Sequence, residues 1–235
     1  MKKILSFLLA LGMLFSFSMT AFADASGNMY NFNCENLNYT VEYIMNDSTV
    51  TEKITIYEKG NTPILLEKIV TSDGTITVYQ NGIQTVTLTG GNYAQYVSVA
   101  QGHEPQLLTG SHNDSTSTYA TYPCGYNQAH SYVSRNQYTV TILTNATAAS
   151  ITASLVGLLM SPVASATLSI ITALSQQAID KGADYIDVSE TKYFVHGAYA
   201  NDMNCYHALY TYYNLTNTGS KSVIGNKWVY TQELV

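Results

Sequence analysis

The feature that most constrains this chain is a long stretch without charge. No Asp, Glu, Lys or Arg occurs between Arg135 and Asp180, a run of 44 residues in a chain that is 11% charged. At that composition, a given window of this length is free of charge by chance with a probability on the order of 1%. A helical segment of this kind is stable only inside a protein core or in lipid.

The uncharged window predicts two helices, over residues 146–160 and 163–181. They are separated at Ser161-Pro162, because proline suits the first turn of a helix, and Gly182 provides the stop signal. Small residues recur at every fourth position, so they share one face of each helix. They are Ala149, Ala153, Gly157 and Ser161 in the first helix, and Ser165, Ser169 and Ala173 in the second. Such a face lets helices approach closely, as they do inside membranes.

Three interpretations of residues 139–183 are open at this point. The segment is the core of a soluble protein, or a single transmembrane span over residues 151–174, or a hairpin that is buried in the secreted form and later enters a target membrane. Pro162 and the absence of basic flanks disfavour the single span. We expect a membrane-active apolar helical hairpin whose key residues are Ala149, Ala153, Gly157, Pro162, Ser165, Ser169 and Ala173.

Residues 24–101 have the pattern of an antiparallel β-meander. Period-two alternation with short turns predicts strands over residues 39–45, 50–57, 63–70, 75–79 and 83–88. Asp73-Gly74 and Asn81-Gly82 favour type I′ turns, whose two central residues need positive φ. The meander therefore forms the N-terminal part of the fold.

The remaining segments complete an α+β fold. Residues 102–138 are expected to be a polar linker of loops, because Pro and Gly interrupt every period. Residues 184–235 return to antiparallel strands rich in tyrosine, over residues 191–199, 205–214 and 227–233. Tyr206, Tyr210 and Tyr212 share one face of a strand, and with Trp228 they form a candidate contact face.

Charge in the meander is expected on its surface. Glu52, Glu58 and Glu67 are each followed by a lysine, which is typical of a solvated strand. These lysines are Lys53, Lys59 and Lys68. The chain carries a net charge of −6 and has no basic cluster beyond its first three residues, which excludes nucleic acid as a partner.

The N-terminus has the form of a secretory signal peptide, residues 1–23. Lys2 and Lys3 precede an uncharged run that ends in Ala21-Phe22-Ala23, a small-x-small cleavage site. We therefore expect a secreted, extracellular protein that begins near Asp24. Removal of the two lysines brings its net charge to −8.

Export places the three cysteines in an oxidising compartment, where at most one intramolecular disulfide can form. We expect Cys124 to pair with Cys205, which would connect the two segments that flank the apolar window. Cys34 is then a free or intermolecular thiol. The sequence alone leaves other pairings open.

Motifs for catalysis and metal binding are weak. Cys124, His196 and Asn201 or Asp202 follow the order of papain-like peptidases without their local signature, and that activity is a minor alternative. His103, Glu104, His112 and Asp114 lack the regular spacing of zinc sites. We expect a non-enzymatic protein with no metal and no cofactor.

The order of parts resembles a group of secreted proteins of Gram-positive bacteria. These parts are the signal peptide, the meander with its Asp-Gly turn, the small-residue helices of residues 146–178, and tyrosine-rich strands such as residues 206–213. Some members of the group resemble large bacteriocins of the geobacillin type. The resemblance implies an antibacterial role, with a target-cell membrane or cell-surface component and an immunity protein as partners. The alternative is an extracellular binding module with a contact face of Tyr206, Tyr210, Tyr212 and Trp228.

Overall fold

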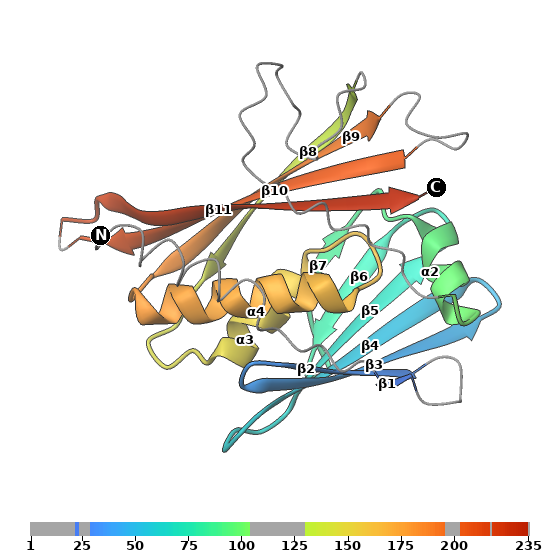
Figure 1. Ribbon diagram of the computed structural model, residues 1–235, viewed down its shortest axis with the longest axis horizontal. Helices are drawn as coiled ribbons and strands as arrows, with labels where there is room; N and C mark the ends of the chain where they lie inside the picture. Colours follow the sequence, from blue (N-terminus) through green and yellow to red (C-terminus); the bar gives the residue numbers. More distant parts are fainter. Residues whose placement is uncertain (1–21, 24–28, 104–129, 196–202, 217, 235) are drawn as a thin grey trace, which may run out of the picture.

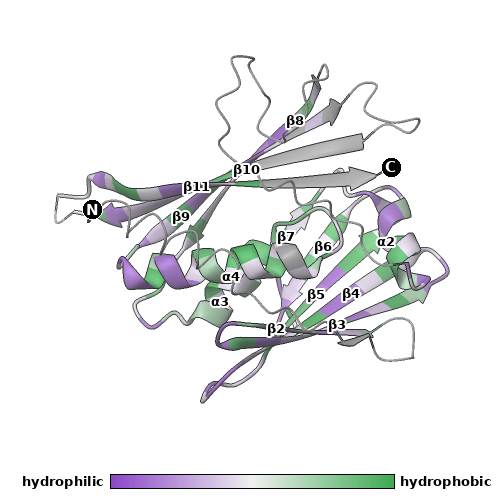
Figure 2. Ribbon diagram, in the orientation of Figure 1, coloured by the Kyte–Doolittle hydropathy of each residue, from purple (hydrophilic) through white to green (hydrophobic). Residues whose placement is uncertain are grey.

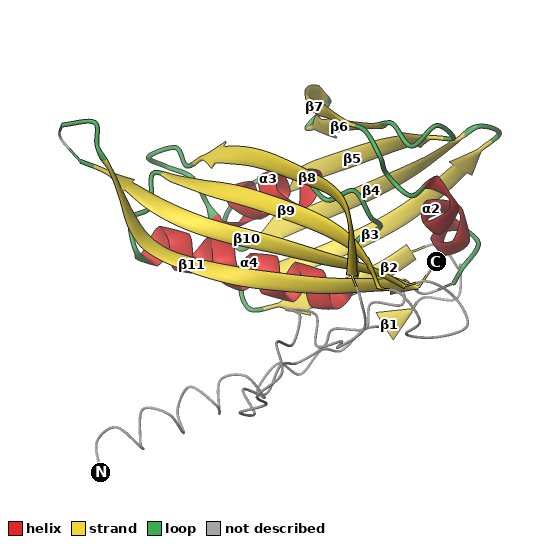
Figure 3. Ribbon diagram, turned by 90° about the horizontal axis from the view of Figure 1, so that it is seen from above, coloured by secondary structure: helices red, strands yellow, loops and turns green. Residues whose placement is uncertain are grey.

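The protein has three layers, in which two helices lie between two antiparallel sheets (Figure 1). The computed structural model describes residues 22–23, 29–103, 130–195, 203–216 and 218–234. Figure 3 shows the same order of layers from above, with the helices behind the second sheet. The α+β class predicted from the sequence is confirmed.

Among the described residues, the first sheet contains seven strands in chain order, each antiparallel to the next, and the two-residue β1 belongs to the predicted signal peptide. They are β1 (Phe22–Ala23), β2 (Met29–Cys34), β3 (Leu37–Asn46), β4 (Thr49–Glu58), β5 (Ile64–Thr71), β6 (Ile76–Gln80) and β7 (Ile83–Leu88). Alternate residues of β3, β4 and β5 are buried, because one face of the sheet packs against the helices. The five predicted strands are confirmed as β3 to β7, whereas the pattern did not predict β1 and β2.

The turn between β6 and β7 has the predicted conformation. Asn81 and Gly82 have φ angles of 51° and 79°, the positive values that a type I′ turn requires. The type I′ turn predicted at Asp73-Gly74 is wrong, because Gly74 has a positive φ of 80° and Asp73 does not have a positive φ. In this turn, the Asp73 carboxylate accepts hydrogen bonds from the Thr71 hydroxyl at 2.5 Å and the Thr75 N–H at 3.0 Å. The residues of these two turns therefore specify how β6 is aligned with β5 and β7.

Helix α2 (Tyr93–Ala100) lies in a segment that the sequence pattern assigned to the meander. The Asn92 side chain accepts a hydrogen bond from the Gln95 N–H at 3.2 Å and so caps the helix. Tyr96, Val99 and Ala100 are its buried residues. They follow the helical spacing of three and four, but eight residues are too few for that period to be clear in a sequence.

The second sheet has the order β11-β10-β9-β8. Its strands are β8 (His130–Thr141), β9 (Tyr185–Val195), β10 (Met203–Leu215) and β11 (Lys221–Leu234). The predicted tyrosine-rich strands correspond to β9, β10 and β11. Strand β8 begins within the predicted polar linker, whose residues 104–129 lie outside the described residues.

Two helices occupy the uncharged window, α3 (Ala148–Gly157) and α4 (Ser165–Asp180). Thr147 and Ser150 form a capping box at the start of α3. After α4, Gly182 has a φ of 64°, as its predicted role as a stop requires. Pro162 lies in the connection between the helices, so its predicted place in the first turn of the second helix is wrong.

The helical structure is interrupted between Gly157 and Ser165, so residues 151–174 do not form one continuous helix. In the part of the chain that the structure describes, no helix has both the length and the hydrophobicity needed to cross a membrane. The hydrophobic colouring of α3 and much of α4 in Figure 2 therefore belongs to two short helices that pack between sheets. They contact each other through the Thr152 hydroxyl, which donates to the Ser175 hydroxyl at 2.9 Å.

The small residues of α3 allow this helix to pack closely against the first sheet. A Cβ atom on Gly157 would lie 3.2 Å from Val78 Cγ1 and 3.6 Å from Leu66 Cδ1. Ala149 and Ala153 on the same face are 2% and 0% exposed. Contact with a sheet is therefore sufficient to explain the predicted small-residue face in the folded protein.

We expect Gly157→Leu to lower the free energy of unfolding by ~1–3 kcal/mol, because the new side chain has no room beside Val78. Urea denaturation measures the change. Gln177→Leu, on the exposed part of α4, is the control and should change stability by less than ~0.5 kcal/mol. Equal effects of the two substitutions would contradict the packing described for α3.

Candidate functional site

A buried ion pair lies at the centre of the inner face of the first sheet. Glu52 on β4 is directly opposite Lys68 on β5 and Tyr43 on β3 in the strand register. Lys68 Nζ lies 2.9 Å from Glu52 Oε2, and both side chains are fully buried. The cross-strand pairing therefore brings a cation, a carboxylate and a phenol together in one row.

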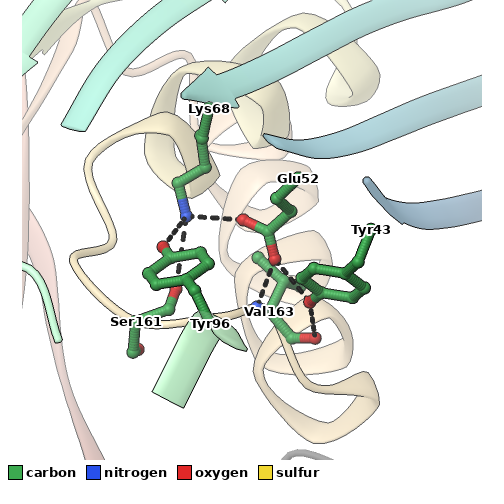
Figure 4. Close-up of polar contacts among 6 residues, drawn as sticks. All are labelled: Tyr43, Glu52, Lys68, Tyr96, Ser161 and Val163. Carbon is green, nitrogen blue, oxygen red and sulfur yellow. Dashed lines mark hydrogen bonds and ion pairs between the residues drawn. The ribbon is translucent and has the colours of Figure 1, made fainter. Parts of the chain in front are cut away.

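The ion pair binds the connection between α3 and α4 (Figure 4). Lys68 donates to the Ser161 carbonyl at 3.2 Å, and the Val163 N–H donates to Glu52 Oε1 at 2.6 Å. Lys68 also donates to the Tyr96 hydroxyl at 3.1 Å, which adds α2 to the cluster. Three strands, α2 and the connection between the helices thus meet at two buried charges.

All donors of Lys68 are used in this cluster, because its three contacts match the three protons of an ammonium group. Tyr43 donates to Glu52 Oε1 at 2.6 Å. Burial, followed by the charge of Glu52, raises the pKa of Tyr43 well above its ordinary value, so the phenol remains a donor. The cluster is saturated and closed to solvent, so its contacts position the segments of the chain that meet there.

The predicted solvent exposure of Glu52 and Lys68 is wrong. Both lie in phase with buried aliphatic residues on their strands, Glu52 between Val50 and Ile54 and Lys68 between Leu66 and Val70. Strand alternation was the signal that could have revealed them. The neighbouring outward pair has the expected position: Lys53 and Glu67 are 3.4 Å apart, with 36% and 26% of their side chains exposed.

An open groove lies between the two sheets, and α3 forms its floor. It consists of two adjoining hollows of about 390 and 360 Å³ that share Gln80, Val140, Thr141 and Ser154. The other lining residues come from strands β5 to β7 and the turn before β5, from β8, from the connection between β8 and α3, and from α3 itself. They are Asn61, Thr62, Ile64, Leu66, Val78, Thr85, Val86, Tyr138, Thr139, Leu143, Asn145, Ala146, Thr147, Ser150, Ile151, Ala153, Gly157 and Leu158.

No charged side chain is among the residues that line this groove. Thr, Ser, Asn and Gln supply donors and acceptors, while aliphatic residues supply apolar contact. Burial, and then the nearby charge of Glu190, raise the pKa of Tyr138 to about 12, so its phenol is neutral at physiological pH. The groove is therefore suited to an uncharged ligand that has hydrogen-bonding groups.

The groove lies beside the outermost described strand of each sheet. Strand β7 is the last strand of the first sheet, and β8 is the last strand of the second. Four consecutive residues of β8, 138–141, line one hollow, together with Thr85 and Val86 of β7. Sequence reasoning missed this site, because β7 and β8 are far apart in the chain and only the folded layers bring them together.

The predicted hairpin residues are distributed through the helical layer. Ala149, Ala153, Gly157 and Pro162 are buried, and Ser165, Ser169 and Ala173 are partly buried. Ala153 and Gly157 also line the groove. The structure thus gives this set packing contacts in the fold and exposes none of its members fully.

The predicted tyrosine contact face does not lie on the surface. Tyr210 and Tyr212 are only 2% and 1% exposed, because their face of β10 is turned toward the protein core. Trp228 is 48% exposed and is paired with Leu209, which lies on the opposite face of β10. The side chain of Tyr206 is outside the described set.

The cysteine and metal predictions fall largely on residues that the structure does not describe. Cys124 and the side chain of Cys205 are among them, as are His196, Asn201 and Asp202, so the disulfide and the peptidase alternative stay predictions. Cys34 is a buried free thiol whose pKa is raised by burial. Of the four candidate metal ligands, only His103 is described, while Glu104, His112 and Asp114 are not.

Among residues 22–23, 29–103, 130–195, 203–216 and 218–234, no group of three His, Cys, Asp or Glu residues is arranged to hold a metal ion. His103 Nδ1 lies 3.1 Å from the Ser98 carbonyl at the end of α2. The groove is therefore the candidate site that the described residues define best.

Comparison with protein-family models, curated proteins and solved structures found no match to this chain.

We expect Glu52→Leu and Lys68→Met each to lower the free energy of unfolding by ~3–5 kcal/mol, because each leaves one buried charge without its partner. The double substitution should cost much less than the sum of the two. Urea denaturation of all four proteins gives the coupling energy.

The outward pair provides the matched control. Lys53→Leu and Glu67→Leu change charges on the same two strands, and each should alter stability by less than ~1 kcal/mol. Additive losses from Glu52→Leu and Lys68→Met would contradict the proposed coupling.

Proposed function

We propose that the protein is a secreted binding protein that holds an uncharged extracellular ligand in the groove between its two sheets. The observation that carries this proposal is the uncharged lining of an open groove in an acidic chain. The proposal keeps the binding-module alternative and moves its contact site from the tyrosine face to the groove. The predicted signal peptide, residues 1–23, supports an extracellular location.

The chemistry of the lining defines the ligand class. Side-chain amides and hydroxyls such as those of Gln80, Thr141 and Asn145 can pair with hydroxyl or amide groups of a ligand. Val140, Ile151 and Leu158 provide apolar surface beside them. Glycan hydroxyls and peptide backbones both have this mixture of polar and apolar groups, and neither requires a charged partner.

Catalysis has less support in this groove. None of its lining residues is Asp, Glu, His, Cys or Lys, the side chains that most often act as bases or nucleophiles. Tyr138 is its one titratable side chain, and its raised pKa makes it a poor base near neutral pH. We therefore propose binding without enzymatic chemistry.

We expect Gln80→Glu to weaken ligand binding by about ten-fold or more, because it replaces a neutral amide with a charged carboxylate of nearly the same size in the uncharged groove. Arrays of neutral glycans and of uncharged, end-blocked peptides would supply the ligands, and calorimetry would measure the affinity. Gln84→Glu is the matched control, since Gln84 is exposed on β7 and does not line the groove. If Gln80→Glu and Gln84→Glu bind the ligand with equal affinity, the ligand does not bind in the groove.

A second candidate function is the perturbation of a target membrane by a hairpin of α3 and α4. The observation that favours it is the uncharged composition of residues 136–179, in which two apolar helices are covered by sheets. Release of these helices would require separation of the layers and of the Glu52–Lys68 cluster. This is the bacteriocin-like function, with a target-cell membrane and an immunity protein as partners.

For membrane perturbation, the mature protein should release dye from liposomes. Ala173→Asp should abolish the leakage, because a carboxylate opposes insertion of α4 into hydrocarbon. Ala173 is partly buried, so this variant disturbs the fold less than Gly157→Arg, which places a large side chain against Val78. Intact liposomes over a wide pH range, without growth inhibition of related bacteria, would rule out this function.

A further inference from the structure

Among the described strands, β8 has a neighbour on one edge only, and its other edge lies beside the groove. It is hydrogen-bonded only to β9 among the described strands of its sheet. A strand at the edge of a sheet presents backbone N–H and C=O groups that can pair with another chain. The location of this edge therefore determines which groups a ligand in the groove would meet.

The backbone groups of alternate β8 residues point toward the groove. The Ile142 N–H, just after the strand, donates to the Asp184 carbonyl at 2.8 Å, on the side of β9. Because inward and outward pairs alternate in an antiparallel ladder, the backbone groups of Gln137, Thr139 and Thr141 face away from β9. Thr139 and Thr141 are then the edge residues at the groove.

The lining residues support this orientation. Side chains of a strand alternate between its faces, so side chains alone would line a hollow with every second residue. Residues 138–141 line it consecutively. Tyr138 and Val140 share the face of Ile186, which is buried, whereas the Thr139 hydroxyl donates to Asp187 at 2.6 Å on the other face. Thr139 and Thr141 thus line the hollow with the backbone groups at the edge of the strand.

This part of β8 lacks the features that usually protect an edge strand. Residues 136–141 contain no charged residue and no proline. The bulge of β8 lies between Tyr132 and Ser134, away from the groove residues. Strand β7, on the other side of the groove, is also free of charge and proline.

We propose that the ligand of the groove is an extended, uncharged peptide segment that adds to β8 as an antiparallel strand. This inference rests on the proposed binding function and names its ligand class. Peptide residues opposite Thr139 and Thr141 donate and accept backbone hydrogen bonds, and their side chains lie on the outer face. The residues between them direct small apolar side chains toward α3, on the side of the hollow that Ala153 and Gly157 line.

The test uses a fluorescent, end-blocked octapeptide with alternating residues, Ser-Val-Thr-Ala-Thr-Val-Ser-Ala, titrated into the mature protein. Directly opposite residues on paired strands share a face, so Ser and Thr of the peptide lie opposite Thr139 and Thr141. N-methylation of its Ser and Thr residues should weaken binding by about ten-fold or more, since it removes the paired N–H groups. N-methylation of Val and Ala should have less than about a three-fold effect.

Thr139→Pro provides the matching change on the protein. It removes an edge N–H that β9 does not use, and proline is tolerated on such edges. Thr139→Val retains the N–H and is the control. We expect loss of peptide binding by Thr139→Pro and retained binding by Thr139→Val, with circular dichroism to verify folding.

The outcomes separate the two proposals. If the two sets of N-methyl groups weaken peptide binding equally, or if neither set weakens it, strand addition is overturned. This outcome does not depend on the proline variant. Binding of a neutral glycan that Gln80→Glu weakens, with no peptide binding, would retain the proposed function and overturn this inference. If Gln80→Glu weakens the binding of neither the peptide nor any arrayed ligand, the proposed function and this inference are both overturned.

Discussion

The fully buried pair of Glu52 and Lys68 makes the first sheet and the helical layer interdependent. A charge removed from water is costly unless its partners are in place, and here the partners come from the first sheet, α2 and residues 161–163. The sheet cannot bury these two charges favourably without the connection between α3 and α4. The helical connection in turn obtains hydrogen bonds for the Ser161 carbonyl and the Val163 N–H only from that sheet. We infer that the sheet and the helical layer fold as one cooperative unit.

The groove follows from the same arrangement. The ion pair fixes the connection at one end of α3, and the small residues Ala153 and Gly157 allow the helix to lie close to β5 and β6. In the described part of the chain, β7 and β8 are the outermost strands of two separate sheets, and α3 lies at the base of the groove between them. The uncharged window thus fills the space between the sheets and also provides the apolar floor of the site. A single helix accounts for both properties.

The local elements could be predicted from the sequence because their signals are local. Asn81 and Gly82 specify a tight turn, and alternating residues specify β3 to β7. Glu52 and Lys68 were placed on the surface because their residue type was given more weight than their phase, although strand alternation points them inward. Tyr210 and Tyr212 shared a face as predicted, but no local signal indicates which face of β10 meets the helices. The groove depends on the relative positions of two distant edge strands, which no local pattern contains.

The two proposed functions place opposite demands on the cluster of Glu52 and Lys68. A groove that selects its ligand needs α3 held at a fixed distance from β8, and directional contacts to Glu52 and Lys68 specify the position of residues 161–163 better than apolar contacts do. Membrane entry needs the same contacts to break and exposes both charges during the separation of the layers. A cluster in which all three Lys68 donors are satisfied within the protein opposes that separation. The geometry of this cluster is therefore the physical reason for preferring ligand binding in an intact fold over release of the helices.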